Sequence, residues 1–155
     1  MKTKIIFITF YIMLSLLSSC CIYDENEGYF MLNFQIVNQN EEDIFQNYYN
    51  IDSLELYAVD YEYAEILYID TTNNFTKLNF DVFFDTTTER GGTEYELIYY
   101  LYLNNNDTDT IKVIFSLEEG KCSGYPKEAI TVFYNKDEYN GNLETIFSFK
   151  KITNQ

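Results

Sequence analysis

The stretch KLNFDVFFD, residues 77–85, decides the fold class of this chain. Apolar side chains recur at every second position of it, at Leu78, Phe80, Val82 and Phe84. The polar side chains between and beside them are Lys77, Asn79, Asp81 and Asp85. Because successive side chains of a β-strand point to opposite faces, this alternation predicts a strand with one face in a core and the other in solvent.

Similar runs follow one another along the rest of the chain, and each ends in Asn, Asp, Gly or Thr residues that favour turns. The composition, with 16 Tyr, 13 Phe and a single Pro, also favours strands. Only residues 41–50 could add one helical turn. The sequence therefore predicts an all-β fold, a single antiparallel β-sandwich. The other predicted strands are 29–37, 53–59, 64–69, 95–103, 110–117, 129–134 and 144–150.

A central hairpin is predicted around the polar run NNNDTDT, residues 104–110, which separates two strand-like segments. Tyr95 lies shortly after Gly92 and resembles the tyrosine of an immunoglobulin-like corner, although an ordinary core tyrosine would produce the same pattern. The resemblance and the spacing of the strands suit an immunoglobulin-like sandwich.

The N-terminus has the pattern of a signal peptide. Lys2 and Lys4 precede an apolar run from Ile5 to Leu17, which is shorter than the roughly 20 residues that a helix needs to cross a bilayer. A basic head followed by a short apolar segment is typical of secretory signals. We therefore expect residues 1–19 to be a signal peptide.

The end of this apolar run and the three residues after it, Leu17-Ser18-Ser19-Cys20, resemble a bacterial lipobox. The resemblance implies cleavage between Ser19 and Cys20 and attachment of lipid, including palmitate, to the Cys20 thiol. A plain secreted protein, cut at an ordinary signal site, is the alternative. Cys21 fits the pattern less well, because Cys20 would then fill a position that prefers a small residue.

Three acids follow, at Asp24, Glu25 and Glu27, and they resemble the export signal of Bacteroidota lipoproteins displayed on the outer face of the outer membrane. A solvated linker, on a domain that faces the periplasm, would have the same composition. The expected organisation is a signal peptide over 1–19, a lipidated cysteine and acidic tether over 20–28, and a β-sandwich domain over 29–155. As a whole the chain resembles small Bacteroidota lipoproteins with one immunoglobulin-like domain.

The composition argues against several function classes. The net charge is −15, and removing the signal with its two lysines would make it more negative, so nucleic acid is not an expected partner. The chain has no histidine, which removes Ser-His-Asp and Cys-His catalysis and leaves Cys122 without an activating base. The acids Glu94 and Glu96 fit a solvated strand face. We expect neither an enzyme nor a cofactor.

The sequence offers two kinds of candidate binding residues. Oxygen ligands for calcium could come from Asn105, Asp107 and Asp109, but the run lacks the glycine and distal glutamate of an EF-hand, and Asn and Asp are also good turn formers. No metal is therefore expected. Exposed tyrosines on sheet faces could instead contact a protein or a glycan.

Short Asp-Ser/Thr sequences resemble the O-glycosylation sites of Bacteroidota envelope proteins, and a Thr-rich β protein also produces them by chance. They occur at Ser53, Thr71, Thr86 and Thr110. The expected function is a membrane-anchored binding or accessory module, held by its lipid and engaging a protein or glycan. The alternative is a structural envelope lipoprotein without a discrete ligand.

Overall fold

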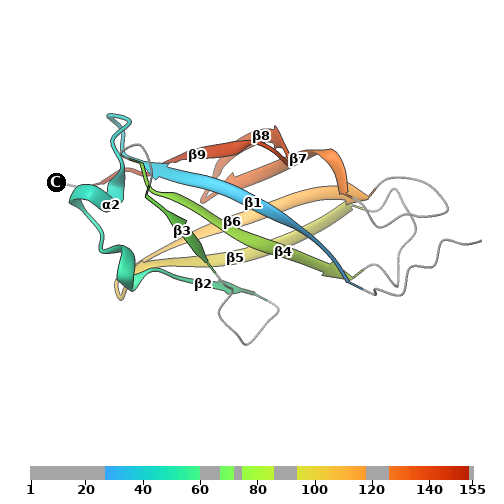
Figure 1. Cartoon of the computed structure of the whole chain (residues 1–155), viewed down its shortest axis with the longest axis horizontal. Coiled ribbons are helices and arrows are strands. Elements are labelled where there is room, and N and C mark those ends of the chain that lie inside the picture. The colour runs from blue at the N-terminus through green and yellow to red at the C-terminus, as the bar shows by residue number, and fades with distance from the viewer. Residues whose placement is uncertain (1–26, 60–66, 72–74, 86–93, 118–125, 154–155) are drawn as a thin grey trace, which may run out of the picture.

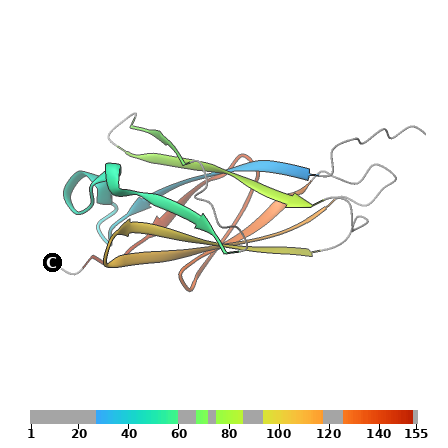
Figure 2. The same ribbon diagram turned by 90° about the horizontal axis from the view of Figure 1, so that it is seen from below.

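The computed structural model describes residues 27–59, 67–71, 75–85, 94–117 and 126–153, and these form two β-sheets packed face to face (Figures 1 and 2). The four-stranded sheet has the order β3-β4-β1-β9, with β3 (Tyr68–Asp70), β4 (Lys77–Asp85), β1 (Glu27–Val37) and β9 (Ile146–Lys150). The five-stranded sheet has the order β2-β5-β6-β7-β8, with β2 (Glu55–Ala58), β5 (Glu94–Asn104), β6 (Asp107–Leu117), β7 (Pro126–Tyr134) and β8 (Asp137–Asn142). The predicted all-β sandwich is confirmed.

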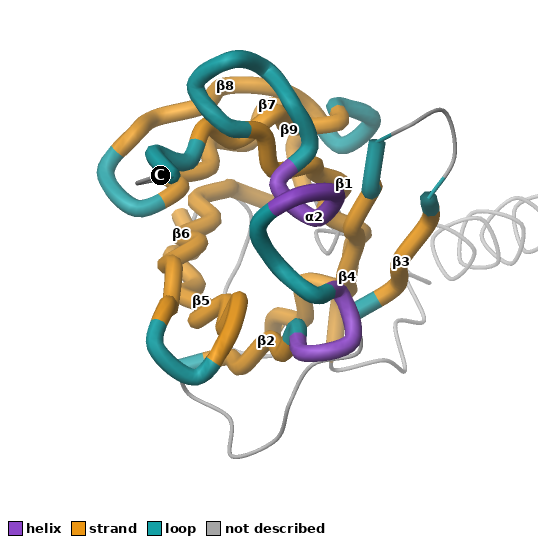
Figure 3. The backbone as a smooth tube through the Cα atoms, turned by 90° about the vertical axis from the view of Figure 1, so that its left-hand side faces the viewer, coloured by secondary structure: helices purple, strands orange, loops and turns teal. Residues whose placement is uncertain are grey.

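The stretch that predicted the fold forms β4, and its four alternating apolar side chains are all buried. They pack between the two sheets together with the inward side chains of the neighbouring strands. Figure 3 shows the backbone of the two sheets that enclose this core, viewed from one end of the sandwich. Aromatic rings dominate this core. Phe34, for example, lies with its ring centroid 6.1 Å from that of Phe80 and 5.3 Å from that of Phe149. Burial of these rings, together with the aliphatic side chains around them, stabilises the sandwich.

Most neighbouring strands are antiparallel, as predicted, but β1 and β9 pair in parallel, with Asn33 opposite Ile146 and Val37 opposite Lys150. The chain leaves β8 in one sheet through a turn in which Thr145 N–H donates to the Asn142 carbonyl at 3.0 Å, and it enters β9 in the other sheet. Alternation in a sequence carries no information on strand direction, so the parallel pair was not predictable from it.

Several boundaries differ from the sequence prediction. The β1 strand begins at Glu27, two residues earlier than expected, so the last two residues of the predicted tether are paired with β4. The predicted run 53–59 starts at the last residue of the 3₁₀ turn η1 (Ile51–Ser53), so β2 begins two residues later than expected, at Glu55. The 41–50 segment contains the single helical turn α2 (Ile44–Asn47). Asp43 caps α2 by accepting from Phe45 N–H at 2.8 Å.

The β8 strand was not predicted, because its sequence DEYNGN is polar and shows no alternation of apolar residues. It forms because the two-residue turn at Asn135 and Lys136 returns the chain beside β7, with Tyr134 opposite Asp137. Asn135 has φ 56, a left-handed conformation that asparagine adopts readily. An edge position tolerates polar side chains on both faces.

Tyr95 packs in the core against Phe115, with the two rings stacked at 9° and their centroids 5.1 Å apart. This contact is that of an ordinary core tyrosine, and the immunoglobulin-like topology stays a prediction. The predicted signal peptide, Cys20, Asp24 and Glu25 lie outside the described residues. Within the part of the chain that the structure covers, no helix is long and apolar enough to cross a bilayer.

Candidate functional site

Lys151, which follows β9 at one end of the sandwich, is the only buried lysine in the described part of the chain. Its Nζ lies 2.7 and 2.8 Å from the two carboxylate oxygens of Asp109 and 3.0 Å from Oδ1 of Asp107. Lys151 is 9% exposed and Asp109 is 3% exposed. Charges this far from water need partners, and each of these has more than one.

Both oxygens of Asp109 and the second oxygen of Asp107 accept further hydrogen bonds. The Tyr134 hydroxyl donates to Oδ2 of Asp109, and Asn135 Nδ2 donates to its Oδ1 at 2.9 Å. The Tyr49 hydroxyl donates to Oδ2 of Asp107. We call the six residues of this network the Lys151 cluster: Tyr49, Asp107, Asp109, Tyr134, Asn135 and Lys151.

Strand register brings the cluster together from distant parts of the sequence. Asp109 occupies an inward position of β6, two residues before the buried Ile111, which pairs with Tyr134 on β7. Lys151 continues the inward positions of Phe147 and Phe149 on β9. Its own backbone N–H donates to the Val37 carbonyl at 2.8 Å, which extends the ladder with β1 and fixes the side chain over Asp109.

The pKa values in the cluster indicate which of its groups are neutral and which are charged. Burial, followed by the charge and hydrogen bond of Asp109, raises the pKa of Tyr134 well above its usual value. Burial and the hydrogen bond to Asp107 likewise raise the pKa of Tyr49. Burial acts to raise the pKa of Asp107 too, but hydrogen bonds from Tyr49 and Lys151 outweigh it and lower that pKa. At neutral pH the tyrosines are therefore neutral donors and Asp107 is a carboxylate.

The structure does not bring the three candidate calcium ligands, Asn105, Asp107 and Asp109, together into one site. Asp107 and Asp109 direct their oxygens at the Lys151 ammonium, whereas Asn105 is exposed at the hairpin tip. Within the described residues, no group of three or more acidic or cysteine side chains is arranged to hold a metal ion. A lysine side chain thus occupies the position that a cation would take.

We expect added calcium to leave the melting temperature of the protein unchanged, because the Lys151 ammonium already occupies the position between the two carboxylates and offsets one of their two charges. A site specific for the folded state would raise stability by about 2.7 kcal/mol at one hundred times its dissociation constant. Thermal melts with calcium and with a chelator measure the difference. A calcium-dependent increase that is lost in Asp107→Ala would contradict this assignment.

A second feature is a group of tyrosines on the outer face of the five-stranded sheet, formed by Tyr57, Tyr100 and Tyr102. We call it the tyrosine face. Tyr57 on β2 pairs directly with Tyr100 on β5 and packs edge-on against Tyr102, with ring centroids 5.4 Å apart and planes at 84°. Tyr100 is 41% exposed and Tyr102 is 38% exposed. The Tyr57 hydroxyl donates to Glu55 at 3.1 Å.

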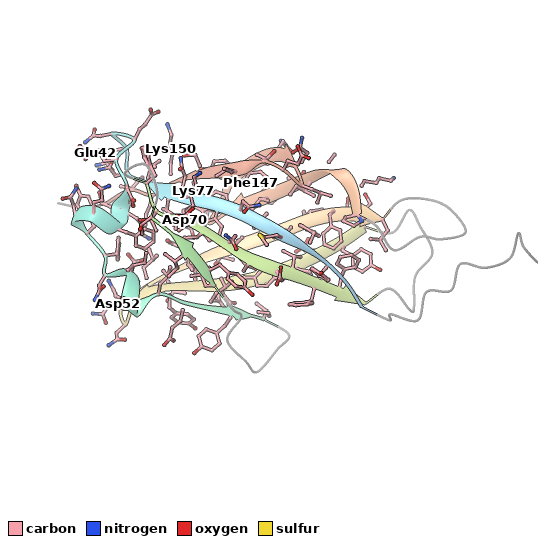
Figure 4. The ribbon with its side chains drawn as sticks, viewed as in Figure 1. Glu42, Asp52, Asp70, Lys77, Phe147 and Lys150 are labelled. Carbon is pink, nitrogen blue, oxygen red and sulfur yellow. The ribbon has the colours of Figure 1, made fainter. Side chains whose placement is uncertain are left out.

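The tyrosine face and the start of β1 lie toward opposite ends of the sandwich. β1 starts at one end in Figure 1, whereas the β5–β6 turn, α2 and the C-terminus lie at the other, where Figure 4 labels Asp52 and Lys150. The 11 residues of β1 span about 35 Å along this axis. A second aromatic group, which includes Tyr29 and Phe83 with ring centroids 5.9 Å apart, lies on the four-stranded sheet near the start of β1.

The candidate O-glycosylation residues and the two acids Glu94 and Glu96 do not gather at one place in the described structure. Ser53 ends η1, and its hydroxyl lies 2.7 Å from the Asn50 carbonyl oxygen and 3.1 Å from that of Leu103. Thr71 is exposed after β3, and Thr110 is half-buried in the middle of the five-stranded sheet. Thr86 lies outside the described residues. Glu94 and Glu96 are exposed on β5, and Glu96 forms an ion pair with Lys112 at 3.6 Å.

An open hollow of about 310 Å³ lies beside α2 and is lined in part by Asp43, Phe75 and Thr76. The two oxygens of Asp43 are already occupied, one by Phe45 N–H at the helix cap and the other by Thr76 N–H at 2.6 Å. The carboxylate in this hollow therefore has a structural role in joining α2 to the start of β4.

Comparison with protein families, curated proteins and solved structures found no match to this chain.

Proposed function

We propose that this chain is an outward-facing lipoprotein of the bacterial outer membrane that acts as a non-catalytic binding or accessory module. The tyrosine face is the observation that carries the binding role. Three tyrosines share one face of the sheet, and two of them are more than a third exposed. Tyrosine combines a large apolar ring with a polar hydroxyl and is enriched at protein interfaces.

The position of the tyrosine face suits a tethered binding module. The predicted lipid anchor at Cys20 precedes β1, whereas the tyrosine face lies toward the far end of the sandwich. A domain held through its β1 end would direct that far end away from the membrane. The resemblance of residues 17–20 to a lipobox and of the following acids to an export signal supports this orientation.

The partner that fits best is a protein with a basic rim. Glu55 lies directly opposite Tyr102 at the margin of the tyrosine face, and the whole chain carries a net charge of −15. Complementary charge around an aromatic centre speeds association and selects partners. A structural lipoprotein without a discrete ligand would show no such selectivity.

The anchor is tested by replacing Cys20 with alanine, and we expect this variant to leave the membrane fraction. Each buried acyl CH₂ contributes about 0.8 kcal/mol, and stable attachment needs more than one chain, so the loss of the lipidated thiol removes the attachment. Cell fractionation with Cys21→Ala as the matched control measures the effect. Retention of Cys20→Ala in the membrane would contradict a lipid anchor at this residue.

The orientation is tested by adding protease to whole cells. We expect the wild-type domain to be removed and the Asp24→Ala/Glu25→Ala variant to be protected, with its lipid intact. Glu27 is left unchanged in this variant because it belongs to β1. Equal removal of both proteins would identify the acids as a linker only, and full protection of the wild type would place the domain in the periplasm.

The binding role is tested with purified Cys20→Ala protein added to cells that lack the chain. We expect saturable binding that Tyr57→Ser/Tyr100→Ser weakens at least about tenfold, because central interface tyrosines commonly contribute more than 1 kcal/mol each. Tyr29→Ser, on the other sheet, is the matched control. Loss of binding after protease treatment of the cells indicates a protein partner, whereas loss only after glycan removal indicates a glycan. Equal binding by all variants would contradict the proposed face.

A further inference from the structure

The arrangement of the Lys151 cluster is that of reactants for amide formation. The Lys151 nitrogen lies 2.7 and 2.8 Å from the two oxygens of Asp109, so it contacts both of the oxygen atoms that are bonded to Cγ. We propose that Lys151 and Asp109 condense into an intramolecular isopeptide bond between Nζ and Cγ, with release of one water molecule.

Asp107 is placed to transfer the protons in this reaction. Its Oδ1 lies 3.0 Å from Lys151 Nζ, and hydrogen bonds from Lys151 and Tyr49 hold it as a carboxylate. The carboxylate can accept a proton from the amine and return it to the departing oxygen. Asp107 is the general base and acid of the proposed reaction and is unchanged at its end.

The steps balance without any further reactant. A proton moves from the Lys151 ammonium to the Asp109 carboxylate and leaves an amine and a carboxylic acid. The nitrogen lone pair then adds to Cγ, and the carbonyl electrons move onto oxygen. Asp107 takes a proton from the nitrogen and gives one to the hydroxyl oxygen, the C–O bond breaks, and water leaves as the carbonyl re-forms. One ammonium and one carboxylate have become one amide and one water.

Hydrogen-bond donors are already directed at both oxygens of Asp109, on which negative charge develops during the addition. The Tyr134 hydroxyl contacts Oδ2, and Asn135 Nδ2 contacts Oδ1 at 2.9 Å. Preorganised donors of this kind stabilise the oxyanion of an acyl-transfer intermediate without reorganisation.

Burial favours the condensation, which is unfavourable in water. Dissolved ammonium and carboxylate ions are stabilised by hydration, and a side chain 3% exposed has lost nearly all of that hydration. The folded strands also hold the two groups together at a high effective concentration. The product is an uncharged amide that joins the C-terminal segment covalently to β6. Such a link would restrict the unfolded chain much as a disulfide does.

The mass of the full-length protein tests the proposal directly. We expect the purified wild type to weigh one water molecule less than its processed sequence. Trypsin should release a branched peptide that joins residues 91–112 to residues 151–155, because an acylated Lys151 is not cleaved. A wild-type mass without the loss, or a loss located at any other residue, would overturn the proposal even if no variant folds.

Variants separate the roles of the individual groups. Lys151→Arg preserves the charge and lacks the amine, so its mass should match its sequence, whereas the exposed-site control Lys136→Arg should retain the loss of water. Asp107→Asn should fold and slow the appearance of the lighter species in a time course after refolding. Bond formation in Asp107→Asn at the wild-type rate would remove Asp107 from the mechanism and overturn its assigned role.

Discussion

Replacement of Lys151 by methionine is expected to lower the free energy of unfolding by about 3–5 kcal/mol, as for other buried ion pairs that lose one partner. Methionine keeps most of the length and volume of the side chain, so packing against the cluster changes little. The loss arises because the Asp109 carboxyl group, at 3% exposure, stays out of contact with water but loses the ammonium that contacts both of its oxygens. The variant should be less stable than the wild type whether Lys151 and Asp109 form an ion pair or an amide bond.

Urea denaturation at neutral pH measures this change, and a second variant identifies its cause. Lys151→Met/Asp109→Leu removes the stranded carboxylate and should recover part of the lost stability. Lys150→Met, on the neighbouring exposed residue, is the matched control and should change stability by less than about 0.5 kcal/mol. A Lys151→Met variant as stable as the wild type would mean that the buried cluster contributes nothing.

Acid is expected to lower the stability that Asp107 contributes through the Lys151 cluster. Because the pKa of Asp107 is lowered in the folded state, its contribution is present above the unfolded-state value near pH 4 and is lost as the pH falls through the lower folded value. The wild type should therefore lose more stability in this range than Asp107→Asn, which has no carboxylate to protonate.

Truncation of Phe149 to alanine is expected to cost about 3–5 kcal/mol, in the range observed for buried phenylalanines. Phe149 is fully buried, and its ring stacks on that of Tyr134 at a centroid distance of 4.7 Å and contacts Phe34 at 5.3 Å. It therefore bridges the two sheets at the point where the short β9 strand joins β1. Loss of the ring leaves a cavity between them and removes the surface against which Tyr134 is held.

The same denaturation experiment with Ser148→Ala provides the comparison, since Ser148 lies on the exposed face of the same strand. Its hydroxyl accepts only a surface hydrogen bond from Gln35 at 3.2 Å, so the expected change is within about 0.5 kcal/mol. Similar losses for the two variants would show that β9 is held by its backbone pairing and not by its buried face.

Strands in which apolar and polar residues alternate clearly were predictable, because burial of one face of a strand requires an apolar side chain at every second position. KLNFDVFFD and residues 110–117 behave in this way: the four alternating apolar side chains of the first are buried, and so are Ile111, Val113, Phe115 and Leu117 of the second. The polar β8 strand has no such pattern, and its position depends on the turn at Asn135. The parallel pairing of β9 depends on where the chain crosses between sheets, which no local pattern encodes.

The Lys151 cluster was missed because its members are conventional surface residues when taken singly. Asp107 and Asp109 suggested a cation, but the cation that meets them is a lysine from the far end of the sequence. The sequence nevertheless contained a signal for it. Every second side chain of a strand lies on the same face, so Asp109 falls on the inward face of β6 and Lys151 on that of Phe147 and Phe149. This alternation therefore predicts two opposite charges inside the same sandwich.

The central claim, that the tyrosine face is the binding surface of a tethered module, is tested most directly by photo-crosslinking in living cells. A photoreactive residue at Tyr100 is compared with one at Glu138, which lies on β8 at the other edge of the same sheet, three strands or about 14 Å away. We predict a discrete crosslinked protein from position 100 that is absent from position 138 and is lost in a Tyr57→Ser background. Identical adducts from both positions, or none from position 100, would contradict the account.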